Sequence, residues 1–374
     1  MSAPAEAVVD LDAYRANLAR LRGAAPTAAQ MAVVKADGYG HGAVTMARAA
    51  LEAGSEWLGV ATVEEAVRLR SAGVDGPVLA WLCPAGADLG PAIDAGVDVA
   101  AGSVEQLDAV LAAPARRRPR VHLKVDTGMA RGGVRGADLS ALIAAAARAH
   151  HGARIEVVGI FSHLACADEP GSPVNAEQRT AFDAAVAELA AAGITDVLRH
   201  LANSAATLVD PAAHHDLVRV GIATYGISPG EALGAPEDLG LQAVMTLRSA
   251  LALVRRVPAG TGVSYGHTFV TQRPTTLGLV PIGYGDGVLR AASNTAEALV
   301  AGTRVRVAGR VCMDQLVLDL GDLDVRRGEE VVLFGSAGRG EPTAEDWARA
   351  AGTIGYEVVT RLGGRIVHRY LGAP

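Results

Sequence analysis

Residues 32–42, AVVKADGYGHG, join a short apolar run to a glycine-rich turn, and a single lysine stands at the junction. The apolar residues 31–34 predict a buried strand that ends at Lys35, and the glycines allow a tight turn into a helix that begins near Val44. Burial of an amine disfavours its charged form and lowers its pKa, which a Schiff-base lysine requires. A lysine at a strand end is more often a solvated surface residue, so the rest of the chain has to decide between these two interpretations.

Short apolar runs alternate with Ala-rich amphipathic stretches from about residue 10 to about residue 230. This alternation predicts an α/β fold, a (β/α)8 barrel whose active site lies at the C-terminal ends of the strands. An open, doubly wound sheet is the alternative. The expected strands are 31–35, 57–61, 78–82, 97–100, 121–125, 157–161, 197–201 and 217–220. The expected helices include 43–53, 63–72, 103–112, 137–149 and 176–192, the last with Asn175 as N-cap and Gln178 in the capping-box position.

The pattern changes after about residue 235, where Val-, Leu-, Thr- and Arg-rich segments with period-two stretches are separated by Gly and Pro. This predicts a mainly antiparallel β domain. The Gly- and Pro-rich segment 228–240 is typical of a domain junction, so we expect a barrel domain over 9–235 and a β domain over 236–374 together with 1–8. The expected strands are 243–257, 275–282, 303–311, 315–320 and 329–334, and Thr343 is expected to cap one helix over 343–351.

The composition disfavours several classes of function. Half of the 374 residues are hydrophobic and the net charge is −6, which argues against disorder and against nucleic acid or an anionic membrane as the main partner. Cys83, Cys166 and Cys312 match neither disulfide nor zinc spacing, and no signal peptide is evident, so we expect a cytoplasmic protein without a metal. A G-x-G-x-x-A match at 38–43 is a weak sign of NAD binding, because Thr62 stands where a ribose-binding acid is expected.

Two further candidate sites follow predicted barrel strands. In LKVDTGMARGG, residues 123–133, Lys124 and Arg131 are either functional or part of a surface ion pair with Asp126. His163 follows the next strand and could be a core histidine or a metal ligand, but no partner with metal spacing is near it in the sequence.

Two adjacent strand ends carry small residues, in HLANSAA (200–206) and RVGIATYG (219–226). Free backbone N–H groups at such junctions bind anions, and in (β/α)8 enzymes the loops after the seventh and eighth strands are where phosphate binds. The sequence therefore predicts a phosphate site at this edge of the barrel.

Four more strings lie in the expected β domain: VSYGHTF (263–269), GYGDG (283–287), RVCMDQ (310–315) and TIGYE (353–357). Together with the barrel motifs, their order resembles the alanine racemases, pyridoxal 5′-phosphate (PLP)-dependent enzymes of fold type III, over nearly the whole chain. The resemblance implies a homodimer that interconverts L- and D-alanine by a two-base mechanism and supplies D-alanine for peptidoglycan. Lys35 would hold PLP and act as one base, and Tyr265 from the other subunit would act as the second.

The same resemblance implies roles for residues around the cofactor. Arg131 would donate a hydrogen bond to the phenolic oxygen of PLP and would contact the substrate. Lys124, which is carbamylated in many members of the family, would orient that arginine. Arg219 would face the pyridine nitrogen, which should stay unprotonated because a guanidinium cannot accept its proton. The other implied residues are Tyr39, Asn203, Ser204, Gly221, Ile222 and Tyr356 at the cofactor phosphate, His163 and His200 beside Arg219, Met313 at the substrate carboxylate, and Asp314 and Tyr284 in support.

Three positions depart from the family pattern. Val288 stands where a tyrosine of the substrate channel is common, Gly355 where an asparagine usually precedes the phosphate-binding tyrosine, and Ala130 where glycine is frequent. Because these leave the substrate breadth open, a broad-specificity or serine racemase of the same fold is an alternative. A non-catalytic PLP-homeostasis protein is disfavoured because such proteins lack the β domain, and a PLP decarboxylase because no decarboxylase cysteine-loop pattern is recognisable.

Overall fold

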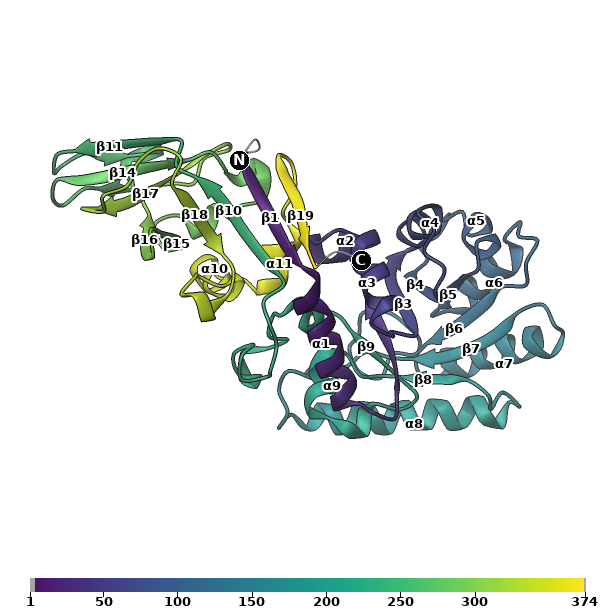
Figure 1. Ribbon diagram of the computed structural model, residues 1–374. Helices are drawn as coiled ribbons and strands as arrows, with labels where there is room; N and C mark the ends of the chain where they lie inside the picture. The colour runs from purple at the N-terminus through teal and green to yellow at the C-terminus, as the bar shows by residue number, and fades with distance from the viewer. Residues whose placement is uncertain (1–3, 373–374) are drawn as a thin grey trace.

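The computed structural model of the chain describes residues 4–372. An eight-stranded parallel barrel is surrounded by helices, and a nine-stranded, mostly antiparallel sheet extends from one side of it (Figure 1). A large hydrophobic cluster runs through both parts. None of the helices in the described range is both long and apolar enough to cross a bilayer. The expected fold class, a barrel followed by a mainly antiparallel β part, is confirmed.

The barrel sheet has the strand order β8-β7-β6-β5-β4-β3-β2-β9. Backbone hydrogen bonds from Asp216 N to Arg199 O and from Arg219 N to Ala202 O, both 3.0 Å, link β9 to β8 and so close it. Its strands are β2 (Ala29–Val33), β3 (Trp57–Thr62), β4 (Val78–Leu82), β5 (Val97–Ala101), β6 (Arg120–Lys124), β7 (Glu156–Phe161), β8 (Leu198–His200) and β9 (Leu217–Val220). Its helices are α1 (Leu11–Ala24), α2 (Lys35–Gly40), α3 (Ala43–Glu52), α4 (Val63–Ser71), α5 (Gly90–Asp94), α6 (Val104–Ala112), α7 (Ala137–His151), α8 (Pro173–Ala191) and α9 (Ser204–Val209).

The start of α8 differs from the prediction. The helix begins at Pro173, because a proline at the first helical position gives up no hydrogen bond and already has a helical φ. Asn175 therefore lies inside the first turn, where its amide donates to two carbonyls of the preceding loop. Gln178 likewise bonds to neighbouring loops and does not form a capping box.

The second sheet has the strand order β11-β14-β17-β16-β15-β18-β10-β1-β19. Its first and last strands along the chain are neighbours, since β1 (Ala5–Asp10) pairs in parallel with β19 (Ile366–Leu371) and antiparallel with β10 (Met245–Ala250). Sequence reasoning missed β1, β12, β13, β15 and β19, and it expected one strand over 243–257 where the structure has two, β10 and β11. The other strands are β11 (Leu253–Val257), β14 (Thr275–Val280), β15 (Glu297–Val300), β16 (Thr303–Val307), β17 (Leu316–Gly321) and β18 (Glu330–Phe334), and β12 (Gly262–Val263) and β13 (Phe269–Val270) form a separate ribbon.

The expected helix near the C-terminus is confirmed as α10 (Ala344–Ala351), and Thr343 and Asp346 form its capping box. A further helix, α11 (Gly355–Thr360), was not expected. The strand expected over 303–311 ends at Val307, because the chain turns at Gly309, whose φ is +79°.

A buried asparagine links the barrel to the second sheet. Asp10 ends β1 and caps α1, so the sheet leads directly into the first barrel helix. Inside α1, Asn17 donates to the carbonyls of Thr224 (3.1 Å) and Gln242 (2.8 Å) and accepts from Gln242 N (2.8 Å). Because breaking a buried hydrogen bond leaves its partner unsatisfied, these contacts fix the end of the barrel against the start of the sheet.

Candidate active site

The segment labelled α2 is a left-handed turn and not a regular helix, and it starts at Lys35, two residues after β2 ends. This corrects the prediction that the strand reaches the lysine. The four residues 36–39 have φ of +50° to +62° and ψ of +39° to +50°. This conformation costs roughly 1–2 kcal/mol for each residue that has a Cβ atom. Such strain persists only where the surrounding structure over-determines it.

The turn is stabilised by hydrogen bonds from its own His41 and from two residues of β19. The Nδ1 atom of His41 lies 2.9 and 3.1 Å from two carbonyl oxygens of the turn, and since both are acceptors, Nδ1 carries the proton. His368 Nε2 lies 2.8 Å from Gly40 O, and Tyr370 donates to His41 O at 3.0 Å. A Cβ atom at Gly42 would overlap the Tyr370 hydroxyl, so β19 approaches the turn as closely as glycine permits.

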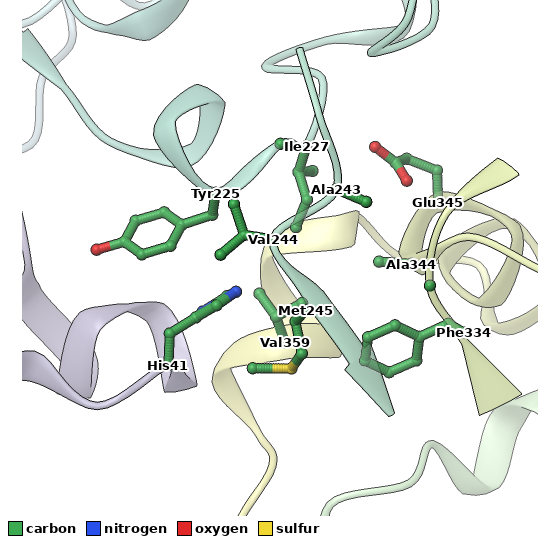
Figure 2. Close-up of a pocket in the computed structure, with 12 residues that line it drawn as sticks. His41, Tyr225, Ile227, Ala243, Val244, Met245, Phe334, Ala344, Glu345 and Val359 are labelled. Atoms are coloured by element: carbon green, nitrogen blue, oxygen red, sulfur yellow. The ribbon is translucent and has the colours of Figure 1, made fainter. Parts of the chain in front are cut away.

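A cavity of about 20 Å³ lies behind His41, between the barrel and the second sheet (Figure 2). Its walls include Tyr225 from the barrel, Met245 from β10 and Glu345 from α10. Burial lowers the pKa of His41 to about 4, and its Nε2 atom has no hydrogen-bond partner among residues 4–372. The cavity has room for one water molecule and none for an amino acid.

Basic side chains gather around the Lys35 amine. Burial, and after it the charge of Arg131, lowers the pKa of Lys35, and the same two causes lower the pKa of Lys124. Burial together with the charges of Arg219, Arg131 and the two lysines lowers the pKa of His163 to about 3. The candidate residues that follow different strands of the barrel are thus close enough for the charge of one to affect the pKa of another.

The surface ion pair that the sequence left open is not formed within the described part of the chain. Asp126 Oδ1 accepts hydrogen bonds from three N–H groups of its own loop, residues 128–130, at 3.0–3.1 Å. It therefore folds the loop that carries Arg131 and does not neutralise it. Ala130 in this loop has φ of +53°, a backbone conformation that glycine adopts more readily than alanine.

Arg219 is buried and bonded to the main chain. Its guanidinium donates to the carbonyl oxygens of His200 (2.7 Å), Ser162 (2.7 Å) and Leu201 (3.1 Å). Nδ1 of His200 and Nδ1 of His163 each lie 3.3 Å from it. Burial lowers the pKa of Arg219 to about 9, which leaves the group charged at neutral pH.

The candidate phosphate residues meet at the ends of β8 and β9. Ser204 Oγ accepts from Gly221 N at 2.8 Å, and Asn203 caps α9. A Cβ atom at Gly221 would lie 2.5 Å from the Tyr39 hydroxyl, so only glycine leaves room for that tyrosine. The rings of Tyr39 and Tyr356 are 6.4 Å apart. This arrangement brings together five of the six candidates, and Ile222 follows directly in the chain.

Four candidate residues that lie in turns and loops next to the second sheet are exposed: Tyr265, Tyr284, Met313 and Asp314. The exposed fractions are 71% for Tyr265, 55% for Met313 and 37% for Tyr284. Asp314 lies 3.5 Å from the guanidinium of Arg365. Tyr265 and Met313 thus have more than half of their surface open to solvent in the single chain.

Sequence reasoning missed two residues beside Lys35. The Lys35 amine lies 5.8 Å from the ring centroid of Trp81. Glu65 accepts from the N–H of Ala36 at 2.7 Å, and its negative charge favours the protonated lysine. A signal for Glu65 was available, because it stands three residues after Thr62 in a capping box that starts α4.

Two family models match the chain: "Alanine racemase, N-terminal domain" over residues 9–229 and "Alanine racemase, C-terminal domain" over residues 244–370. The alanine racemase of Thermobifida fusca is 54% identical over 375 residues, which cover 100% of both chains. That of Streptomyces coelicolor is 52% identical and is covered to 96%, with 98% of this chain. The crystal structure of the alanine racemase from Streptomyces lavendulae, a D-cycloserine producer, has a TM-score of 0.97 and 52% identity, with 99% of this chain and 97% of that chain covered.

Proposed function

This chain belongs to the alanine racemase family and is an amino-acid racemase, and from that premise we propose that it holds pyridoxal 5′-phosphate at Lys35 and works as a homodimer. It interconverts L- and D-alanine, and we propose that it supplies D-alanine for peptidoglycan. The observation that carries the site assignment is the half-buried amine of Lys35, whose charge is opposed by desolvation and by Arg131.

The residues around Lys35 fit this cofactor. Capture of an aldehyde requires an unprotonated amine, which the lowered pKa of Lys35 favours. The phosphate would lie against Ser204 and Gly221, where the Gly221 N–H holds the Ser204 hydroxyl at the junction of two strand ends. Arg219 would face the pyridine nitrogen as a charged donor that cannot accept a proton. When bound, the cofactor withdraws electrons from the substrate's α carbon and makes its proton acidic.

Proton transfer is needed on both faces of the α carbon. We propose that Lys35 removes the α proton of D-alanine and that Tyr265 of the partner subunit removes the α proton of L-alanine from the opposite face. The exposure of Tyr265 in a single chain supports a role in a second copy's site. His163 helps the phenol to ionise: its Nδ1 accepts from Arg219, so its proton resides on Nε2, where it can donate to a phenolate.

Lys124 has the environment that carbamylation requires. Burial and Arg131 favour its neutral amine, which can add to CO₂ with release of one proton. The resulting carbamate is an anion and would hold the Arg131 guanidinium in place. The absence of an ion pair between Asp126 and Arg131 in residues 4–372 supports the need for such an anion.

The test is incubation of the purified protein and PLP with L-alanine in D₂O, followed by chiral separation and mass analysis. We expect D-alanine that carries deuterium at the α carbon. The Lys35→Ala variant, prepared in parallel, should give neither product nor exchange. Product without exchange, or release of CO₂, would contradict the proposed chemistry. Initial rates with serine beside alanine would decide between the alanine racemase and the broad-specificity alternative.

A further inference from the structure

A line of buried polar groups continues from Arg219 through the barrel interior. His200 Nε2 lies 2.9 Å from Nδ1 of His122 on β6, and His122 Nε2 lies 3.3 Å from Oδ2 of Asp98 on β5. Both imidazoles are fully buried and Asp98 is 3% exposed. The proposed reaction uses neither Asp98 nor His122, yet such a chain of groups is costly to bury unless every member is satisfied.

The hydrogen-bond partners fix the tautomer of each imidazole. The Arg219 guanidinium has only donors, so Nδ1 of His200 must be an acceptor and its proton must be on Nε2. That proton faces Nδ1 of His122, which is then an acceptor in turn. The proton of His122 therefore resides on Nε2 and points at the Asp98 carboxylate. One arrangement satisfies all members, and it begins with a carboxylate and ends with a guanidinium.

The side chain of His122 is closely packed. A Cβ atom at Gly159 of β7 would overlap its Nδ1 atom, so the strand passes the ring as closely as glycine allows. Trp57 meets the ring edge-on with centroids 5.5 Å apart, and His200 does so at 5.1 Å. Burial holds the pKa of His200 well below its usual range, which agrees with a neutral ring.

We propose that Asp98 is a positioning residue for Arg219: through the neutral rings of His122 and His200, it keeps Nδ1 of His200 available as one of the acceptors of the guanidinium. The carboxylate also supplies a negative charge to a chain whose other end, Arg219, contacts no carboxylate among residues 4–372. Asp98 has a second partner, Arg120 Nε at 2.9 Å, and Arg120 in turn contacts Glu156 at 2.9 Å.

Without the Asp98 charge, His122 can place its proton on Nδ1 instead. The proton of His200 then moves to Nδ1, where it faces a guanidinium N–H, and Arg219 loses one of its acceptors. This consequence rests on the proposed function only for its effect on catalysis, because the tautomers themselves can be measured without turnover.

The first experiment measures the ring ¹⁵N shifts of the histidines in the wild-type holoenzyme at neutral pH, with His122→Gln for assignment. We expect a protonated Nε2 and an unprotonated Nδ1 on both His122 and His200. An imidazolium or an Nδ1–H tautomer on either ring would overturn the proposal, and this result does not depend on any variant folding or on racemase activity.

The second experiment compares Asp98→Asn with Glu156→Gln, since each removes one carboxylate from Arg120 but only Asp98 belongs to the chain. We expect Asp98→Asn to lower kcat/KM about 10- to 100-fold, as loss of an orienting partner does at metal-bound histidines, and to shift the His200 ring signals and the cofactor absorbance. Glu156→Gln should stay within about twofold. Full activity in Asp98→Asn, or lost activity with unchanged His200 signals, would show that Asp98 only supports the fold.

Discussion

The proposed origin of Tyr265 in the second subunit predicts a definite amount of activity in mixed dimers. Lys35→Ala and Tyr265→Ala subunits are each inactive alone, because every site in their homodimers lacks one base. In a symmetric dimer assembled at random from equal amounts, half of the molecules are mixed, and each mixed molecule has one complete site and one doubly defective site. About 25% of all sites, and so about 25% of the wild-type rate, should return.

The assay uses subunits with two different tags, denatured together and refolded, with the mixed fraction measured by native mass spectrometry. The matched control replaces the Tyr265→Ala subunit by one that carries both substitutions, whose mixed dimers contain no complete site and should stay inactive. If the mixed dimers form and the rate does not rise above this control, the tyrosine does not act across the interface. The exposed fraction of 71% in one chain would then require another explanation.

Three further predictions concern the turn that carries Lys35 and the phosphate site. Gly42→Ala should destabilise the protein by roughly 2–4 kcal/mol through strain and overlap, and urea unfolding should show a smaller loss in the Tyr370→Phe background, where the overlapping hydroxyl is gone; additive losses would contradict the close approach. Because burial lowers the pKa of His41 to about 4, the folded chain binds this proton less readily than the unfolded chain. The free energy of unfolding should therefore fall by about 2 kcal/mol between pH 7 and pH 5, and a fall of equal size in His41→Asn would refute the assignment. Ser204→Ala should weaken PLP binding about tenfold through a lost phosphate contact, measured by cofactor fluorescence, whereas Ser103→Ala, which removes a distant helix cap, should leave it unchanged.

The barrel was predictable because its signal is local. Eight apolar runs that alternate with Ala-rich stretches gave the strand count and placed the candidate side chains at one edge, and Thr343 was recognisable as an N-cap residue at the start of its helix. The start of α8 was misplaced because asparagine resembles an N-cap wherever it precedes an apolar stretch. Only the contacts of Asn175 with the preceding loop show that its amide serves another purpose.

The features that the sequence did not predict depend on contacts between residues that are far apart in the chain. The glycines indicated a turn after Lys35, but its left-handed path follows from the contacts with His368 and Tyr370 near the other end of the chain. Asp98 lies in an apolar run and belongs to no recognisable motif. Its role can be inferred only from its contact with His122 in the folded chain. The approach of Tyr265 to a second copy's site stays a prediction, since one chain cannot display it.

The pairing of β1 with β19 has a consequence for how the enzyme is made. A ribosome delivers the first strand long before the last, so β1 lacks its parallel neighbour until synthesis is nearly finished. The same late strand closes over the lysine turn. The active site of a nascent barrel is therefore incomplete until β19 has been synthesised. A chain truncated before residue 366 would contain every barrel residue but would lack the contacts that hold the turn at Lys35.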